Sequence, residues 1–67
     1  MPKTLKELAK MIAKRDNISL NEAQIIVGET AEEINSAITR GDSYDEVMDI
    51  IQYNLGLEPD YIDLFIM

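Results

Sequence analysis

The chain has 67 residues, of which 46% are hydrophobic and 28% are charged, and its formal net charge is −7. This length allows a single domain, 1–67, and the composition is typical of a folded globular protein rather than a disordered one. Because the sequence has no cysteine and no histidine, disulfides and metal sites built on thiolate or imidazole groups are excluded.

The first predicted element is a helix near 4–15. Thr4 and Glu7 have the spacing of a capping box, in which a hydroxyl and a glutamate satisfy free backbone amides at a helix start. Helical periodicity places one group of apolar side chains on the buried side and the lysines on the other. The buried group is Leu5, Leu8, Ala9 and Ile12, and the opposite group is Lys3, Lys6, Lys10 and Lys14.

A second, longer helix is predicted near 19–40, between a capping box at Ser19 and Glu22 and a glycine stop signal at Gly41. Its periodicity separates an apolar face from a stripe of carboxylates. The carboxylate stripe consists of Glu22, Glu29 and Glu33, and the residues expected to be buried are Ala23, Ile26, Val27, Thr30, Ile34, Ala37 and Ile38.

A third helix is predicted near 43–55, with a capping box at Ser43 and Glu46, and a fourth near 59–66, opened by Pro59. Short loops make sequential helices antiparallel neighbours, so we expect an all-α bundle of three to four helices. In the third helix the outward residues are Asp45, Glu46 and Asp49, and the expected core residues are Tyr44, Val47, Met48, Ile51 and Leu55.

The sequence argues against catalysis and against bound metal or cofactors. Four short helices barely fill their own core, and paired carboxylates such as Asp45 and Asp49 are expected to solvate a helix surface rather than act as acid and base. The segment 42–46 lacks the alternating oxygen ligands and the central glycine of a calcium loop. The apolar runs are too short to span a membrane, and no signal-peptide segment is recognisable, so we expect a cytoplasmic protein that does not contact a membrane.

Two stretches resemble parts of known families. The run Gly41-Asp42-Ser43-Tyr44 resembles the serine motif of acyl carrier proteins, which are also small, acidic and helical. The 24 residues after Ser43 are too few for the helices that follow the serine in that family, and an N-cap already explains Ser43.

The runs 5–9, 18–23 and 34–42 resemble the N-terminal helical hairpin of HU-type DNA-bending proteins, without the sheet and basic arms that hold DNA.

The whole chain is similar to short acidic proteins encoded by phages and prophages of Gram-positive bacteria. The ending Gly56-Leu57-Glu58-Pro59-Asp60-Tyr61 carries this resemblance. It implies an accessory protein that acts by binding, and it names no target.

Three local features are candidate contact sites. Ile25 and Tyr53 are apolar anchors on faces that otherwise carry acids, as expected of a surface for a basic partner. Gly28 lies in a strip of small residues where another helix, of the same chain or of a second copy, can approach closely. The apolar tail packs either inside the chain or in a homodimer, where the self-associating residues would be Ile62, Phe65 and Ile66.

Charge separates the functional hypotheses. Residues 1–15 carry five of the six basic side chains, whereas 16–67 carry twelve of the thirteen acids and one base, Arg40. Most of the surface should therefore repel phosphate, which favours a basic protein partner bound at the acidic face, with nucleic-acid mimicry as one version. The alternatives are nucleic-acid binding through the four lysines, which lack interleaved aromatic residues, and an acyl-carrier-like protein.

Overall fold

The structure, a computed structural model, describes residues 2–66 and contains four helical elements with no strand in that range. They are α1 (Leu5–Asp16), α2 (Leu20–Arg40), α3 (Tyr44–Leu55) and the 3₁₀ helix η1 (Pro59–Leu64). The predicted all-α fold and the order of its elements are confirmed. The fourth element is a 3₁₀ helix rather than an α-helix, and its six residues make it longer than most 3₁₀ segments.

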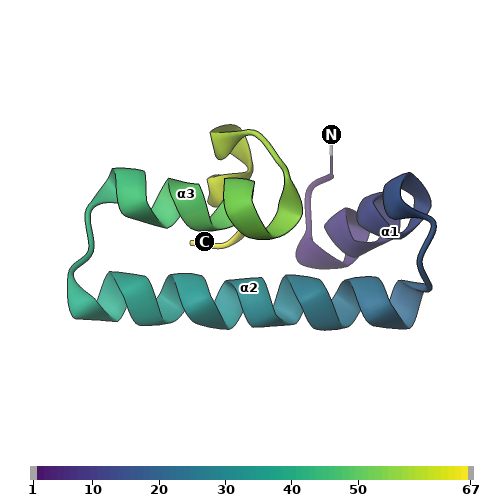
Figure 1. Ribbon diagram of the computed structural model, residues 1–67, viewed down its shortest axis with the longest axis horizontal. Coiled ribbons are helices and arrows are strands. Elements are labelled where there is room, and N and C mark those ends of the chain that lie inside the picture. The colour runs from purple at the N-terminus through teal and green to yellow at the C-terminus, as the bar shows by residue number, and fades with distance from the viewer. Residues whose placement is uncertain (1, 67) are drawn as a thin grey trace.

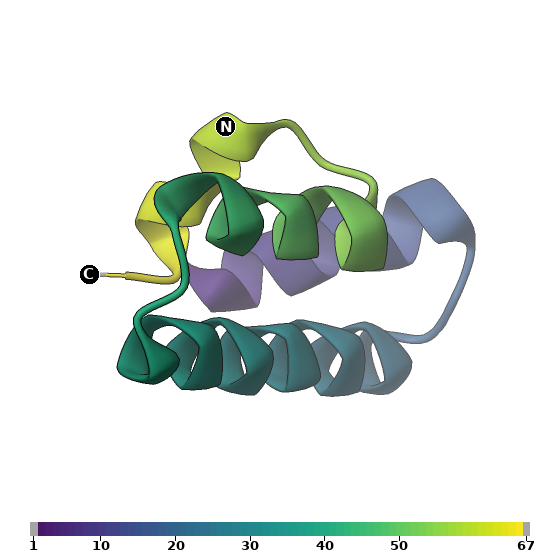
Figure 2. The same ribbon diagram turned by 60° about the vertical axis from the view of Figure 1, so that its left-hand side comes forward.

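Helix lengths determine the arrangement. With 21 residues, α2 is about 31 Å long, close to the longest dimension of the molecule, 34 Å. Both α1 and α3 have 12 residues, so neither can cover α2 alone. Figure 1 shows α1 lying over the first half of α2 and α3 over its second half. Turned by 60°, the chain after α3 folds back beside it as η1 (Figure 2).

The ends of the helices follow the predicted chemistry. At each α-helix start the hydroxyl of Thr4, Ser19 or Ser43 accepts a hydrogen bond from the backbone N–H three residues on. A complete capping box forms at Ser43, where the Glu46 carboxylate also accepts from the Ser43 backbone N–H at 3.5 Å. Within residues 2–66 this return bond is absent at the other two starts, so two of the three predicted boxes are single caps.

Each of the three α-helices is followed by a residue whose backbone is in the left-handed conformation. Gly41 and Gly56 have φ values of 85° and 65°, and Asn17 follows α1 with φ 55°. A left-handed residue lets its own N–H bond to the last carbonyls of the helix, and glycine adopts this conformation without a steric cost. The predicted stop signals are therefore confirmed.

The core lies between α2 and the three elements that cover it. Most residues predicted to face inward are buried, and Thr30 joins them with its hydroxyl bonded to the Ile26 carbonyl at 2.9 Å. Two predictions were wrong: Ile38 is 47% exposed and Tyr44 is 58% exposed. Both residues flank the α2–α3 loop, beyond the reach of α1.

The described part of the apolar tail, 61–66, packs largely inside the chain, and Met67 lies outside the described residues. Ile62 is 2% exposed and Phe65 is 8% exposed, and both belong to the same core cluster as α2 and α3. The Tyr61 hydroxyl lies 3.9 Å from the Met11 sulfur, which links η1 to α1. Of the three residues predicted to self-associate, only Ile66 stays exposed, because the core of one chain accounts for the other two.

No helix of the chain approaches Gly28. A Cβ atom built there meets no heavy atom within 4 Å, so the expected close approach of a helix from the same chain was wrong. The glycine lies in the middle of a regular α-helix on an exposed face. Its lack of a side chain therefore brings flexibility to α2 without bringing a contact.

Gly28→Ala is expected to stabilise the protein by about 1 kcal/mol, because alanine loses less backbone entropy in a helix and finds open space here. In a domain of this size the melting temperature should rise by about 4–8 °C. Thermal unfolding followed by circular dichroism measures the change. Gly41→Ala is the matched control and should destabilise, since φ 85° is strained for alanine. A loss of stability in Gly28→Ala would contradict the open surroundings of Gly28.

Candidate protein-interaction surface

Polar contacts join α2 and α3 where the two helices lie side by side. Asn54 on α3 donates a hydrogen bond to the Glu33 carboxylate on α2 at 2.6 Å, and its amide nitrogen also lies 3.4 Å from the buried Thr30 hydroxyl. This contact fixes how α3 is positioned along α2 at the edge of their interface. The predicted stripe on α2 therefore borders α3 directly at Glu33. We call this edge, which Glu33, Asn54, Arg40 and Glu46 define, the acidic seam.

Arg40 is the single base of the acidic seam. Its guanidinium donates to the Asp42 carboxylate at 2.6 Å. This hydrogen bond, together with the charges of Asp42, Glu46 and Glu33, raises the pKa of Arg40 above its usual value. The same interactions show that acids from α2, the loop and α3 surround one arginine. Since Asp42 already pairs with it, Arg40 cannot neutralise the other two.

The remaining predicted acids spread outward from the acidic seam. Glu22 lies eleven residues before Glu33, which corresponds to about 16 Å along α2, and Glu29 lies between them. Asp45 and Asp49 are exposed on α3. Of the six predicted acids, Glu33 and Glu46 thus lie near enough to Arg40 for their charges to act on it, and the other four lie outside the acidic seam.

The two predicted anchors are exposed. Ile25 is 54% exposed and Tyr53 is 91% exposed, as expected for side chains outside the core. Tyr53 borders a shallow hollow of about 270 Å³ with Asp49 and Gln52. All three residues belong to α3, so this hollow is the space between neighbouring side chains of one helix rather than a cleft between elements.

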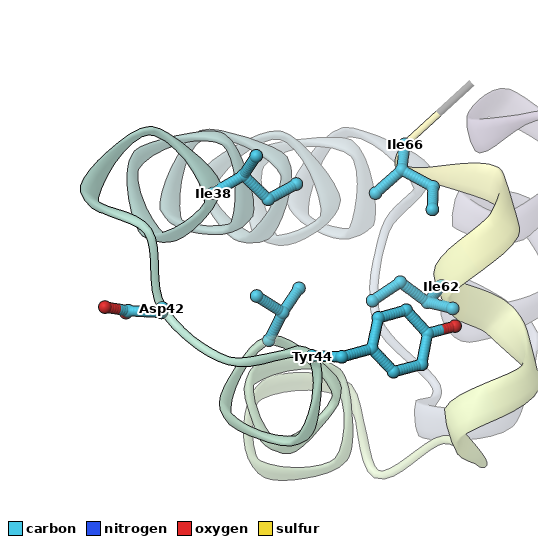
Figure 3. Close-up of a pocket in the computed structure, with 6 residues that line it drawn as sticks. Ile38, Asp42, Tyr44, Ile62 and Ile66 are labelled. Atoms are coloured by element: carbon cyan, nitrogen blue, oxygen red, sulfur yellow. The ribbon is translucent and has the colours of Figure 1, made fainter.

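A larger hollow lies where α2, the loop, α3 and η1 come together. This groove has a volume of about 470 Å³ and is lined by Ile38, Asp42, Tyr44, Val47, Ile62 and Ile66. Figure 3 shows the Tyr44 ring extending toward Ile62 on η1, and Asp42 at the loop end with its carboxylate turned outward. Ile38, Tyr44 and Ile66 are each about half exposed. An exposed apolar group of this kind is typical of a contact surface.

Sequence reasoning missed the groove because it assigned two of its residues to the core. Ile38 and Tyr44 occupy core-facing angles of their helices, but no element fills the space in front of them. The available signal was their position: both lie within three residues of Gly41, at the end of a hairpin where two short helices cannot reach.

The basic residues are concentrated on α1. Its lysines are exposed, whereas Arg15 donates to Asp16 at 2.8 and 3.0 Å. This bond lowers the pKa of the Asp16 carboxyl and raises that of Arg15.

Between Pro2 and Ile66 no three acidic side chains gather in a way that could hold a metal ion. In the same range no helix is long and apolar enough to cross a bilayer.

Comparison with known protein families, with curated proteins and with solved structures finds no match to this chain. The case for a function therefore depends on the acidic seam and the groove.

Proposed function

We propose that this protein is a non-enzymatic interaction module that binds a basic protein partner through the acidic surface of α2 and α3. The observation that carries the proposal is the acidic seam, where Glu33 of α2 contacts Asn54 of α3 and the single base, Arg40, is already paired with Asp42. A surface of this charge attracts and orients a basic partner and repels nucleic acid. The resemblance to phage and prophage proteins adds that the partner belongs to a bacterium or its phage.

One version of this function is mimicry of nucleic acid. Carboxylates in rows can take the place of phosphates in the binding groove of a basic protein. On α2 the row runs from Glu22 through Glu29 to Glu33, and α3 adds Glu46 beside it. Such a mimic competes with DNA or RNA for the partner and does not bind either of them itself.

Affinity capture at two salt concentrations tests the proposal. Tagged protein is incubated with a lysate of a Gram-positive bacterium at about 0.05 M and about 0.5 M salt, where exposed charges are weakly and strongly screened. We expect proteins of high isoelectric point to be retained at low salt and released at high salt. Addition of duplex DNA should displace them if the surface occupies a nucleic-acid groove. Retention of acidic or neutral proteins that resist salt would contradict the electrostatic mechanism.

The alternative, nucleic-acid binding through α1, has one supporting observation. Lys3, Lys6, Lys10 and Lys14 are all exposed. A gel-shift experiment with the purified protein and duplex DNA separates the two functions, because the proposed module should not retard DNA at physiological salt. Retardation that disappears when the four lysines are replaced by glutamate would favour the alternative.

A further inference from the structure

The groove is an apolar surface left open by the fold rather than a loosely packed part of the core. Its deeper residues, Val47 and Ile62, are 3% and 2% exposed and belong to the core cluster. The outer residues, Ile38, Tyr44 and Ile66, are exposed and come from α2, from α3 and from the segment that follows η1. A cavity of about 470 Å³ has the size of a site that receives several side-chain or ligand groups.

The charge around the groove selects its partner. Asp42 lines the groove and pairs with Arg40, so this pair adds no net charge there. Besides Glu46 of the acidic seam, the segments that continue from the lining residues contain three further exposed acids and no further base, so the groove lies in an acidic part of the chain. These acids are Asp45, Asp60 and Asp63. Basic residues beside an apolar anchor complement this arrangement, since the anchor supplies affinity and the charges steer association.

The backbone of the site favours a helical partner. Within residues 2–66 there is no strand, so the groove offers no sheet edge to which an extended chain can add. Its walls present side chains of α2, α3 and η1, and α-helices satisfy their own backbone hydrogen bonds. An amphipathic helix can place apolar side chains into such a groove while its own backbone stays bonded.

A second copy of this chain fits the groove poorly. Symmetric pairing of two grooves would bring their acidic borders together, which is unfavourable. The basic helix α1 has the right charge, but none of the large hydrophobic side chains exposed in the described chain lies on it. It therefore has no anchor to insert.

We propose that the groove formed by Ile38, Tyr44, Val47, Ile62 and Ile66 receives the apolar side chains of a basic amphipathic helix. This proposal rests on the proposed function and specifies its contact site. The groove and the acidic seam lie on different flanks of α2, since Ile38 and Arg40 are separated by about 160° around the helix. The partner helix thus occupies the groove, and the acidic seam contributes by attraction at longer range.

The test uses a synthetic helix of about 18 residues, with leucines on one face and lysines on the other. Two matched peptides carry serine in place of the leucines or glutamate in place of the lysines. Titration into isotopically labelled protein should shift the resonances of Ile38, Tyr44 and Ile66. The leucine–lysine peptide should bind at least about tenfold more tightly than either matched peptide, since each of those lacks either the apolar anchors or the attracting charge.

Matched variants of the protein separate the groove from other exposed apolar residues. The double variant Ile38→Ser, Ile66→Ser should weaken peptide binding about tenfold or more. The control Leu20→Ser removes an exposed apolar side chain at the opposite end of α2 and should leave binding unchanged. Ile38, Ile66 and Leu20 are all exposed, so both variants should stay folded. Equal effects in the two variants, or resonance shifts centred on Ile25 and Tyr53, would overturn the proposal.

Two further outcomes are distinguishable. If salt and reversal of acids weaken binding but the groove variant does not, the groove proposal fails and the proposed function stands. If none of these changes weakens binding, both fail. The remaining possible occupant of the groove is a second copy of this chain, which sedimentation of the protein without peptide tests. A dimer that is lost in the variant Ile38→Ser, Ile66→Ser would assign the groove to that second copy and overturn the proposal of a helical partner.

Discussion

Ile34→Ala is expected to destabilise the protein by about 2–5 kcal/mol, because it removes a fully buried side chain and leaves a cavity in the core. Ile34 faces α2's neighbours in the middle of the molecule, where repacking has little room. A domain of this length has a total stability of about 3–10 kcal/mol. The variant should therefore lose a large fraction of its stability, and urea denaturation followed by circular dichroism measures the loss.

Ile38→Ala is the matched control for this experiment. It is the same substitution one turn further along the same face of α2, at a residue that is 47% exposed instead of fully buried. The expected loss is below about 1 kcal/mol, since little area is removed from contact. The difference in stability loss between the two variants shows where along α2 the buried core ends. Equal losses would mean that Ile38 is covered and that the groove does not exist as an open surface.

Reversing the charge of Glu29 and Asp49 is expected to slow association with the leucine–lysine peptide by about tenfold or more at low salt. Electrostatic attraction acts mainly on the rate of encounter, and it falls steeply when the surface charge changes sign. These two acids are chosen because Glu33 accepts a hydrogen bond from Asn54 and Glu46 caps α3. The variant Glu29→Lys, Asp49→Lys therefore leaves the polar contacts of the acidic seam in place. Stopped-flow measurement at several salt concentrations gives the rates.

The control for this prediction is a variant that has the same net charge as Glu29→Lys, Asp49→Lys. Glu7→Lys with Glu58→Lys, in α1 and on the segment before η1, also replaces two acids by two lysines, so each substitution adds two charges and both variants change the net charge from −7 to −3. If the acidic surface of α2 and α3 attracts the partner, the control should slow association less. Equal slowing in both variants would show that only net charge matters, and no slowing in either would remove the electrostatic mechanism.

The helices could be predicted from the sequence because their signals are local. Thr4, Ser19 and Ser43 each mark a start within one turn, and Gly41 and Gly56 mark stops through their own backbone conformation. The fourth element, predicted as a helix near 59–66, is confirmed as a helix, and the sequence did not indicate that it would be of the 3₁₀ type. Whether six residues after a proline form an α or a 3₁₀ turn depends on how Ile62 and Phe65 reach the core, which is a tertiary effect.

The open groove could not be predicted from periodicity. A helical wheel gives the angle at which Ile38 and Tyr44 point, and that angle is correct for both. It does not say whether another element is long enough to cover them. Since α1 lies over the opposite half of α2 (Figure 1), only η1 can approach these residues, and it leaves them half exposed.

The pattern of contacts between the elements also bears on how this protein folds. Each element contacts the one that follows it in the chain, α1 with α2, α2 with α3, and α3 with η1. Contacts between segments close in sequence require little loop closure, and helical domains of this kind form on a timescale of about microseconds to milliseconds. Both α1 and α3 pack on α2, whereas η1 packs mainly on α3. Amide exchange should therefore be slowest in the middle of α2 and fastest in η1.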